Sequence, residues 1–373
     1  MRIVFDIHEA PEAYLSASSN FLTELIIEMA GRYSHHSFIY LVHERLQKTC
    51  NLPDNISIHY PNKVLLKWLG KRFWYKYFLI KELSNLKADL YVTADNLFLN
   101  KTGIRVLLFL IHGTEILQDK ALSKKNMSGT KMLVNAIRKA DTIITFSVND
   151  QQIVQMQSPK PKAKIELFLP RPVEIPELKW TEKEMVKNDF AGGVEYFLFA
   201  GDLHERYDLI VLLKAFSLFK KWQHSNMRLI IAGNKTTWTE EFSKQLASFK
   251  YRNDVELMVN PSKETLQKII AGAYAFVYPA AYDNFPISIL QAMQVGVPVI
   301  SFPIQVCKEW CANTVMYPET NDASGFAKSM QLIYKDERLR SDFIDAAKTH
   351  LANREQNDLA ETCMNFFEET IAK

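Results

Sequence analysis

The stretch AFVYPAAYDNFPISILQAMQVGVPVIS, residues 275–301, contains an apolar run, a polar turn, a helical pattern and a second apolar run. Short apolar runs of this kind are typical of strands that are buried on both faces of a parallel sheet. The helical pattern between them makes the stretch a strand–helix–strand unit of such a sheet. Its turn carries Asp283, and Gln291 follows eight positions later. The turn is either a ligand site or only a buried junction between a strand and a helix.

The same alternation continues along the chain in both directions. In the first half, apolar runs separated by helical patterns lie at 2–7, 37–43, 89–93, 104–112 and 142–147. A second set lies at 196–201, 227–233, 255–259, 275–280 and 297–301. This alternation predicts two doubly wound α/β domains. Residues 158–177 are rich in proline, which breaks helices, and we expect the interdomain linker there.

Length and composition narrow the class of protein. The 373 residues suffice for two cores, and a net charge of +3 is too small to indicate nucleic-acid binding. Cys307 and Cys311 lack a second pair of zinc ligands, so we expect reduced structural cysteines and no metal site. The N-terminus does not resemble a signal peptide, and no apolar stretch reaches the ~20 residues of a membrane-spanning helix. We therefore expect a cytoplasmic protein, which still allows peripheral contact with a membrane.

Polar residues and glycines gather where the apolar runs end. Open parallel sheets bind ligands at the carboxyl ends of their strands. Two such domains in tandem would place these ends around one cleft, and interdomain clefts are common ligand sites. The informative segments are therefore 112–114, 201–207, 233–235 and 279–288.

Four segments, in chain order, resemble the family-four retaining glycosyltransferases of the GT-B fold. They are IRKADTIITFSVND (137–150), FLFAGDLHERYDLIVLLKAF (197–216), MRLIIAG (227–233) and the stretch at 275–301. The resemblance covers most of the chain and is more specific in the second half. It implies two Rossmann-like domains facing a cleft, with 1–170 on the acceptor side and 171–350 holding a nucleotide-sugar donor. It also implies a C-terminal helix, 351–373, that returns to the first domain, and no metal or other cofactor.

The resemblance assigns the turn at 282–288 to the donor site. Asp283 and Gln291 fall on the family's two carboxylate positions, where the first orients the hydroxyls of the sugar and the second binds the ribose. A helix N-terminus attracts phosphate or sugar oxygens, whereas Gln is a weaker acceptor than a carboxylate. Asp283 is thus a predicted catalytic residue. The predicted donor-binding residues are Gly201, Asp202, Arg206, Tyr207, Gly233, Lys235, Asn284, Phe285, Pro286, Ile287, Ser288 and Gln291.

The loop after the first strand of the second domain departs from the family pattern. The family has an Arg directly after the Gly and a Lys five positions further on, and both neutralise the donor diphosphate. Here Asp202 and Tyr207 occupy these positions. A leaving diphosphate needs positive charge in the transition state, and an Asp would repel it. Arg206 and Lys235 are the candidate replacements for the missing cations.

The first domain offers fewer candidates. His112 ends a strong apolar run, and the resemblance gives it a catalytic contact with the donor sugar and the acceptor; the alternative is a structural hydrogen bond. Gly113 and Thr114 beside it suit close approach of the acceptor. The loop after the first strand lacks the family's glycines, so Ser18 and Ser19 are its small acceptor-side residues. An ordinary polar loop that precedes a helix is the alternative there.

The segment KVLLKWLGKRFWYKYFLIK, residues 63–81, mixes cations with large aromatic residues. Such a mixture suits contact with an anionic membrane surface. It equally suits a core helix whose outer face is solvated. Membrane contact would agree with a lipid-linked acceptor.

Two functions of different classes remain open from the sequence. The first is a retaining hexosyltransferase that moves a sugar from a nucleotide-diphosphate donor to a saccharide or lipid-linked acceptor, in the synthesis of surface polysaccharide or glycoconjugate. The second is a degenerate relative that binds a sugar or a partner without catalysis, because several expected donor-site residues are replaced. Another two-domain α/β enzyme, such as an epimerase, is a further alternative. Binding of nucleoside diphosphates would separate the first two.

Overall fold

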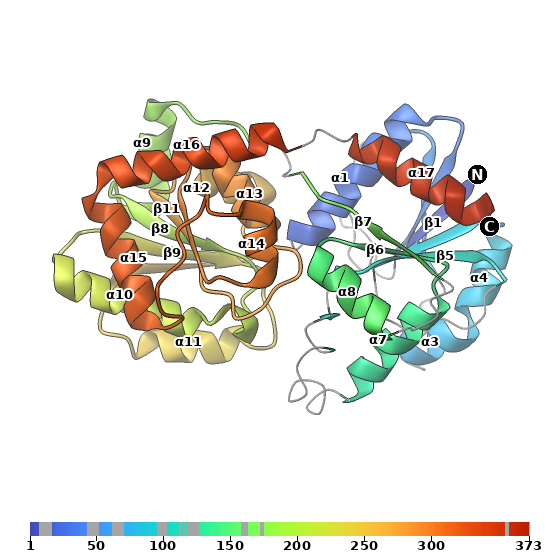
Figure 1. The fold of residues 1–373 in the computed structure, drawn as a ribbon, viewed down its shortest axis with the longest axis horizontal. Coiled ribbons are helices and arrows are strands. Elements are labelled where there is room, and N and C mark those ends of the chain that lie inside the picture. Colours follow the sequence, from blue (N-terminus) through green and yellow to red (C-terminus); the bar gives the residue numbers. More distant parts are fainter. Residues whose placement is uncertain are drawn as a thin grey trace. The chain divides into compact units, whose positions relative to one another are not determined.

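The computed structural model describes residues 1–6, 17–42, 52–61, 71–94, 103–111, 113–114, 117, 127–157, 163–171, 175–354 and 358–372, without the side chains of 17–20 and 71–72. The chain forms two compact units (Figure 1). Unit 1 consists of Met1–Pro170 and Asn357–Lys373, and unit 2 consists of Arg171–Gln356. Both are α/β units built on parallel sheets, which confirms the predicted fold class.

Unit 1 contains a parallel sheet whose described strands have the order β3-β2-β1-β4-β5-β6-β7. The central strands are almost wholly apolar and buried, as the sequence predicts. Two edge strands, β3 and β7, are only partly buried and were not predicted as strands. The strand bounds are β1 Arg2–Asp6, β2 Ser37–Leu41, β3 Ile56–His59, β4 Leu90–Thr93, β5 Arg105–Phe109, β6 Thr142–Thr145 and β7 Lys164–Leu167.

The last helix of the chain, α17 (Leu359–Ala372), packs in unit 1 beside α1 (Ala17–Arg32) (Figure 1). Phe367 lies 5.9 Å from Phe5 of β1 between ring centroids, and the Thr370 hydroxyl donates to the Thr142 hydroxyl at 2.7 Å. The remaining described helices of unit 1 are α3 Lys71–Tyr77, α4 Leu79–Asn85, α7 Met127–Lys139 and α8 Val148–Gln157.

Two predicted boundaries differ from the structure. Residues 164–167 lie in β7, so the linker prediction is wrong for this part of 158–177. The strand contains no proline and pairs with β6 along one side only, which explains how it fits among prolines. The predicted start of the C-terminal helix, residue 351, instead lies in the last turn of α16 (Glu337–Asn353) of unit 2, and α17 begins at Leu359.

Unit 2 contains a parallel sheet with the strand order β10-β9-β8-β11-β12. Its central strand, β8, is buried at every residue because both faces are covered by helices. The strands are β8 Tyr196–Ala200, β9 Arg228–Gly233, β10 Val255–Val259, β11 Ala275–Tyr278 and β12 Val299–Ser301. The other helices are α9 Trp180–Ala191, α10 Leu209–Gln223, α11 Thr239–Ala247, α12 Lys263–Ala271, α13 Ile287–Gln294, α14 Gln305–Cys311 and α15 Ala323–Lys335.

Two further expectations from the sequence concern reduced structural cysteines and membrane-spanning helices. Cys307 and Cys311 are free and fully buried on α14, and burial raises the pKa of both thiols. Across the described residues, no helix is both long and apolar enough to cross a bilayer.

Candidate active site

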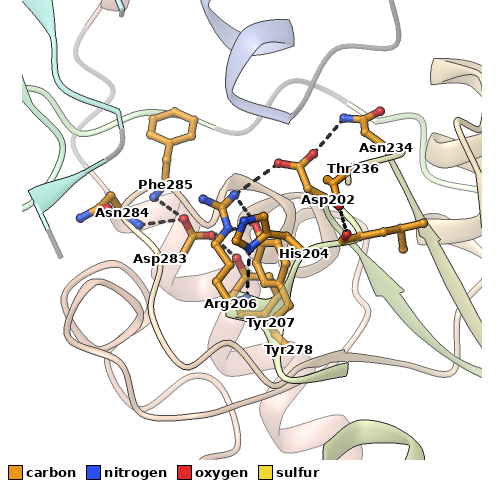
Figure 2. Close-up of polar contacts among 11 residues, drawn as sticks. Asp202, His204, Arg206, Tyr207, Asn234, Thr236, Tyr278, Asp283, Asn284 and Phe285 are labelled. Carbon is orange, nitrogen blue, oxygen red and sulfur yellow. Dashed lines mark hydrogen bonds and ion pairs between the residues drawn. The ribbon is translucent and has the colours of Figure 1, made fainter. Parts of the chain in front are cut away.

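Three loops of unit 2 meet at the carboxyl ends of the neighbouring strands β9, β8 and β11 (Figure 2). The Leu203 N–H after β8 donates to the carbonyl of Asn234 after β9 at 3.0 Å, and the Thr236 hydroxyl donates to the Leu203 carbonyl. The Ala281 N–H after β11 donates to the Arg206 carbonyl at 2.8 Å. These bonds fix the loop after β8 between its two neighbours.

Gly233 permits the close contact between the first two loops. A Cβ atom at this position would lie 1.6 Å from the carbonyl oxygen of Gly201. Both predicted glycines of the donor site therefore lie where backbones of adjacent strand ends touch. Only residues without a Cβ at 233 fit this packing.

Arg206 lies at the centre of the cluster, in the short 3₁₀ turn Glu205–Tyr207. His204 caps the turn and accepts the Arg206 N–H on Nδ1 at 3.1 Å. The Arg206 guanidinium donates from Nη2 to Asp202 Oδ2 at 3.3 Å and to the Tyr207 hydroxyl at 2.8 Å. Its carbon lies 4.7 Å from the centroid of the Tyr207 ring. The side chain is held from both sides and is only 14% exposed.

The charge of Arg206 is maintained despite burial. Burial lowers the pKa of the guanidinium, but the negative fields of the Asp283 and Asp202 carboxylates oppose this effect, and the pKa lies above its ordinary value. Among the described residues only Nη2 has protein partners, and the buried Nε has none. A guanidinium carries five N–H donors. The site therefore presents a fixed cation with unused hydrogen-bonding capacity.

Asp283 lies beside Arg206, at the start of the turn after β11 (Figure 2). Its Oδ2 accepts the hydroxyl of Tyr278 and, at 3.4 Å, that of Tyr207. Its Oδ1 accepts the backbone N–H groups of Asn284 at 2.7 Å and Phe285 at 3.2 Å. Burial, followed by the field of Asp283, raises the pKa of both tyrosines, which remain protonated donors. Asp283 is thus oriented from two elements.

The rest of the turn and the helix after it are largely buried. Phe285 packs edge-on against Trp310 of α14, with 5.4 Å between ring centroids. Pro286 precedes α13, and Ile287 and Ser288, the first residues of that helix, are buried. Gln291 lies in the second turn of α13, half-buried, and its side chain makes no hydrogen bond to any described residue.

Lys235 lies outside the contacts of this cluster. Its Nζ is 3.5 Å from Glu240 Oε1 and its side chain is more than half exposed. Its backbone N–H donates to Asn260 Oδ1 at 2.7 Å. Of the two candidate cations, Arg206 is therefore the one that the described contacts bring to Asp283 and Tyr207.

The unit 1 candidates are described only in part. His112 lies outside the described residues, as do the side chains of Ser18 and Ser19 in the first turn of α1. Gly113 has a φ of 107°, which favours glycine. The buried Thr114 donates its hydroxyl to Asp150 Oδ1 on α8.

Three residues of the cluster were not among the predicted site residues: Tyr278, and also Asn234 and His204, although the last two lie in segments that the sequence indicated. Tyr278 ends β11 and orients Asp283, and Asn234 donates its amide to Asp202 Oδ1 at 3.0 Å. Each lies at a strand end or within three residues of Gly201 or Gly233, so position was an available signal. Their roles depend on side-chain directions, which the sequence pattern does not contain.

Comparison with known proteins identifies a matching family, relatives in sequence and solved structures of similar fold. Residues 181–350 match the family described as glycosyl transferases group 1. The chain is 26% identical over 146 residues to O-antigen chain mannosyltransferase B of Escherichia coli, covering 39% of this chain and 38% of that protein. It is 25% identical over 151 residues to O-antigen chain mannosyltransferase RfbU of Salmonella typhimurium, covering 40% and 41%. The match thus spans about two-fifths of the length of these curated relatives.

Two solved structures resemble the entire chain. Sucrose-phosphate synthase from Thermosynechococcus elongatus superposes with a TM-score of 0.80 at 13% identity, covering 100% of this chain and 99% of that one. WaaG, a glycosyltransferase involved in lipopolysaccharide biosynthesis, gives 0.76 at 14% identity, covering 98% and 99%. These likenesses show that the chain has the GT-B fold.

Proposed function

We propose that the protein transfers a hexosyl group from a nucleotide-diphosphate sugar to a saccharide or lipid-linked acceptor, because residues 181–350 match the glycosyl transferases group 1 family. The transfer retains the configuration of the sugar and serves the synthesis of surface polysaccharide or glycoconjugate. Two of the curated relatives are O-antigen chain mannosyltransferases, which supports a role in polysaccharide synthesis.

Arg206 is the observation that carries the proposal. A largely buried, charged guanidinium with unused donors at the strand ends of a parallel sheet is suited to an anion. The donor diphosphate is such an anion, and its charge grows as the bond to the sugar breaks. A fixed cation therefore stabilises the transition state more than the ground state. The proposal requires no metal, because the guanidinium supplies the positive charge.

The other residues receive roles that follow from their positions. Asp283, held by Tyr278 and backbone N–H groups, accepts hydrogen bonds from the hydroxyls of the donor sugar. Gln291 binds the ribose, and His112, assigned from the sequence, orients the sugar toward the acceptor. The leaving diphosphate accepts the proton of the acceptor hydroxyl as the new glycosidic bond forms. The protein mainly supplies geometry and charge.

Calorimetric titration tests the proposal directly. UDP, GDP and their hexose conjugates are each titrated into the full-length protein up to millimolar concentration. We expect one of the two nucleoside diphosphates to bind with micromolar to submillimolar affinity, and the corresponding sugar nucleotide to support transfer. Failure of every nucleotide to bind would overturn the proposed transferase activity and favour a non-catalytic role.

Replacement of Gln291 by Glu tests the placement of the ribose. We expect the Kd of the preferred nucleoside diphosphate to fall about fivefold, because hydrogen bonds to a charged acceptor are roughly twice as strong as neutral ones. Gln294→Glu on the same helix is the control, since Gln294 accepts the Ile175 N–H at 3.4 Å and has its own partner. Weaker binding by Gln291→Glu, or equal tightening by both variants, would show that Gln291 does not bind the ribose.

We further propose that unit 1 contacts an anionic membrane on its cytoplasmic side through α3. The helix has an inner and an outer face. Trp74 and Tyr75 are buried in the core of unit 1, which agrees with the core-helix alternative. Phe73 and Tyr77 on the outer face are 40% and 52% exposed, with ring centroids 4.4 Å apart. Lys76 Nζ lies 4.8 Å from the Tyr77 ring.

This outer face combines the two features of an interfacial helix. Exposed aromatic rings favour the headgroup region, and lysines favour anionic lipid. Before Phe73 the sequence adds Lys63, Lys67 and, in the first turn of α3, Lys71 and Arg72, whose side chains lie outside the description. Core packing accounts for Trp74 and Tyr75, whereas it leaves the exposed aromatic pair without a function.

Vesicle sedimentation measures this contact. We expect the protein to bind phosphatidylglycerol-containing vesicles and not pure phosphatidylcholine. Phe73→Ser with Tyr77→Ser, or Lys67→Glu with Lys71→Glu, should weaken binding at least about tenfold, since each lysine near such a surface contributes about 1 kcal/mol. Trp180→Ser is the control, because Trp180 is 74% exposed on α9 of unit 2. Absent binding, or equal binding by the variants, would refute the contact.

A further inference from the structure

Asp202 forms an ion pair with Arg206, the cation of the candidate site, and is held in that position by Asn234. It follows Gly201 at the carboxyl end of β8. Its Oδ2 is 3.3 Å from Arg206 Nη2, and its Oδ1 accepts the Asn234 amide at 3.0 Å (Figure 2). Both carboxylate oxygens are therefore engaged, and Asn234 holds the group in the orientation that faces the guanidinium. A carboxylate with two partners is not free to turn away without losing one of them.

The same contacts place Asp202 beside any anion that binds Arg206. The unused donors of the guanidinium share one planar group with Nη2, and Nη2 already lies at hydrogen-bond distance from Asp202. A phosphate that reaches those donors comes within a few ångströms of the carboxylate, about the length of the guanidinium itself. At such separations two like charges repel strongly in a partly buried site. Asp202 therefore makes the binding free energy of every phosphate ligand less favourable, and this effect increases with the negative charge of the ligand.

The donor and its nucleotide product differ in that charge. In a sugar nucleotide each phosphate carries one negative charge, because the terminal phosphate is esterified by the sugar. After transfer, the terminal phosphate of the free nucleoside diphosphate is a monoester with a second pKa of about 6, so it carries close to one further negative charge at pH 8. A carboxylate beside this phosphate repels the product more than the donor.

We propose that Asp202 discriminates between donor and product. It weakens binding of the free nucleoside diphosphate more than binding of the sugar nucleotide, and so it promotes product release. The inference rests on the proposed function, because it takes Arg206 as the partner of the diphosphate. Arg206 provides the attraction that both ligands share. Asp202 makes the affinities for the two ligands differ. Because it occupies the position where the resemblance expects an Arg, it limits inhibition by the product.

Asp202→Asn tests the inference, because the amide keeps the shape of the side chain and removes its charge. At pH 8 we expect the Kd of the preferred nucleoside diphosphate to fall about tenfold, and that of its sugar nucleotide to fall by no more than about threefold. The product inhibition constant should fall together with the Kd of the nucleoside diphosphate. Asp202→Ser is the second variant, since it removes the charge and retains a hydroxyl for Asn234. Thermal unfolding of both variants establishes that they fold.

Glu264→Gln is the matched control, because it removes one carboxylate from an exposed pair with Lys268 on α12. It should change neither Kd. Equal tightening of both ligands by the folded Asp202 variants would overturn the inference and leave the proposed function intact, as would weaker binding of the nucleoside diphosphate. If no nucleotide binds the wild type or either variant, the proposed function itself fails, and the inference fails with it.

Discussion

Arg206→Ala is expected to lower kcat/KM for sugar transfer by two to three orders of magnitude, about 3–4 kcal/mol of transition-state stabilisation. Arg206 is the largely buried cation of the cluster, and its guanidinium contacts Asp202 and Tyr207 and lies within the field of Asp283. Its removal takes away the charge that balances the leaving diphosphate. Because that charge matters most in the transition state, kcat should fall as well as the affinity for the donor. Steady-state kinetics with the preferred sugar nucleotide measures both.

Two comparisons make this result specific to the guanidinium. Arg206→Lys keeps the charge but not the planar group that contacts Asp202 and Tyr207 together, so we expect an intermediate loss. Lys268→Ala removes an exposed cation from α12 and serves as the control for net charge. A larger loss from Lys235→Ala than from Arg206→Ala would assign the diphosphate to Lys235 instead.

The sequence predicts every strand in the middle of the two sheets and also both edge strands of unit 2, β10 and β12. Residues 196–201 and 227–233 correspond to β8 and β9, whose side chains are buried on both faces and read as continuous apolar runs. The two strands that it misses, β3 and β7, are edge strands with partly exposed residues. An edge strand needs fewer apolar residues, so its sequence resembles that of a polar loop. Apolar content therefore reveals an edge strand only where the strand itself is apolar, as in VELMV of β10.

The candidate site could be located from the sequence, but its contacts could not. Strand ends and glycines indicated the segments around 201, 233 and 283. The contact between Tyr207 and Asp283 joins loops after β8 and β11, which are neighbours only through the order of the strands in the sheet. Asp202 and Arg206 are close in sequence, yet their pairing depends on the 3₁₀ turn capped by His204. At the two positions where the resemblance expects cations, Asp202 and Tyr207 instead contact the guanidinium of Arg206.

Gly233→Ala should be the most destabilising single-methyl substitution at this site. The new Cβ would lie 1.6 Å from the carbonyl oxygen of Gly201 and 2.8 Å from its carbon. Both are backbone atoms at the end of β8, so no flexible side chain can move aside. We expect unit 2 to lose about 3 kcal/mol or more of stability. Its Tm should fall by about 6–12 °C, because a unit of this size loses about 2–4 °C per kcal/mol.

The same substitution should also disrupt the site before it unfolds the unit. Relief of the clash must separate the loop after β8 from that after β9, and this breaks the bond from the Leu203 N–H to the Asn234 carbonyl. The turn that carries Arg206 is attached to that loop, so nucleotide binding should be lost at temperatures where the variant is still folded. Gly31→Ala on α1 is the control, because a Cβ there meets no atom within 4 Å and alanine favours a helix. Nucleotide affinity that survives in Gly233→Ala would mean that Arg206 keeps its position without the contact between the two strand ends, and calorimetry below the Tm distinguishes the two outcomes.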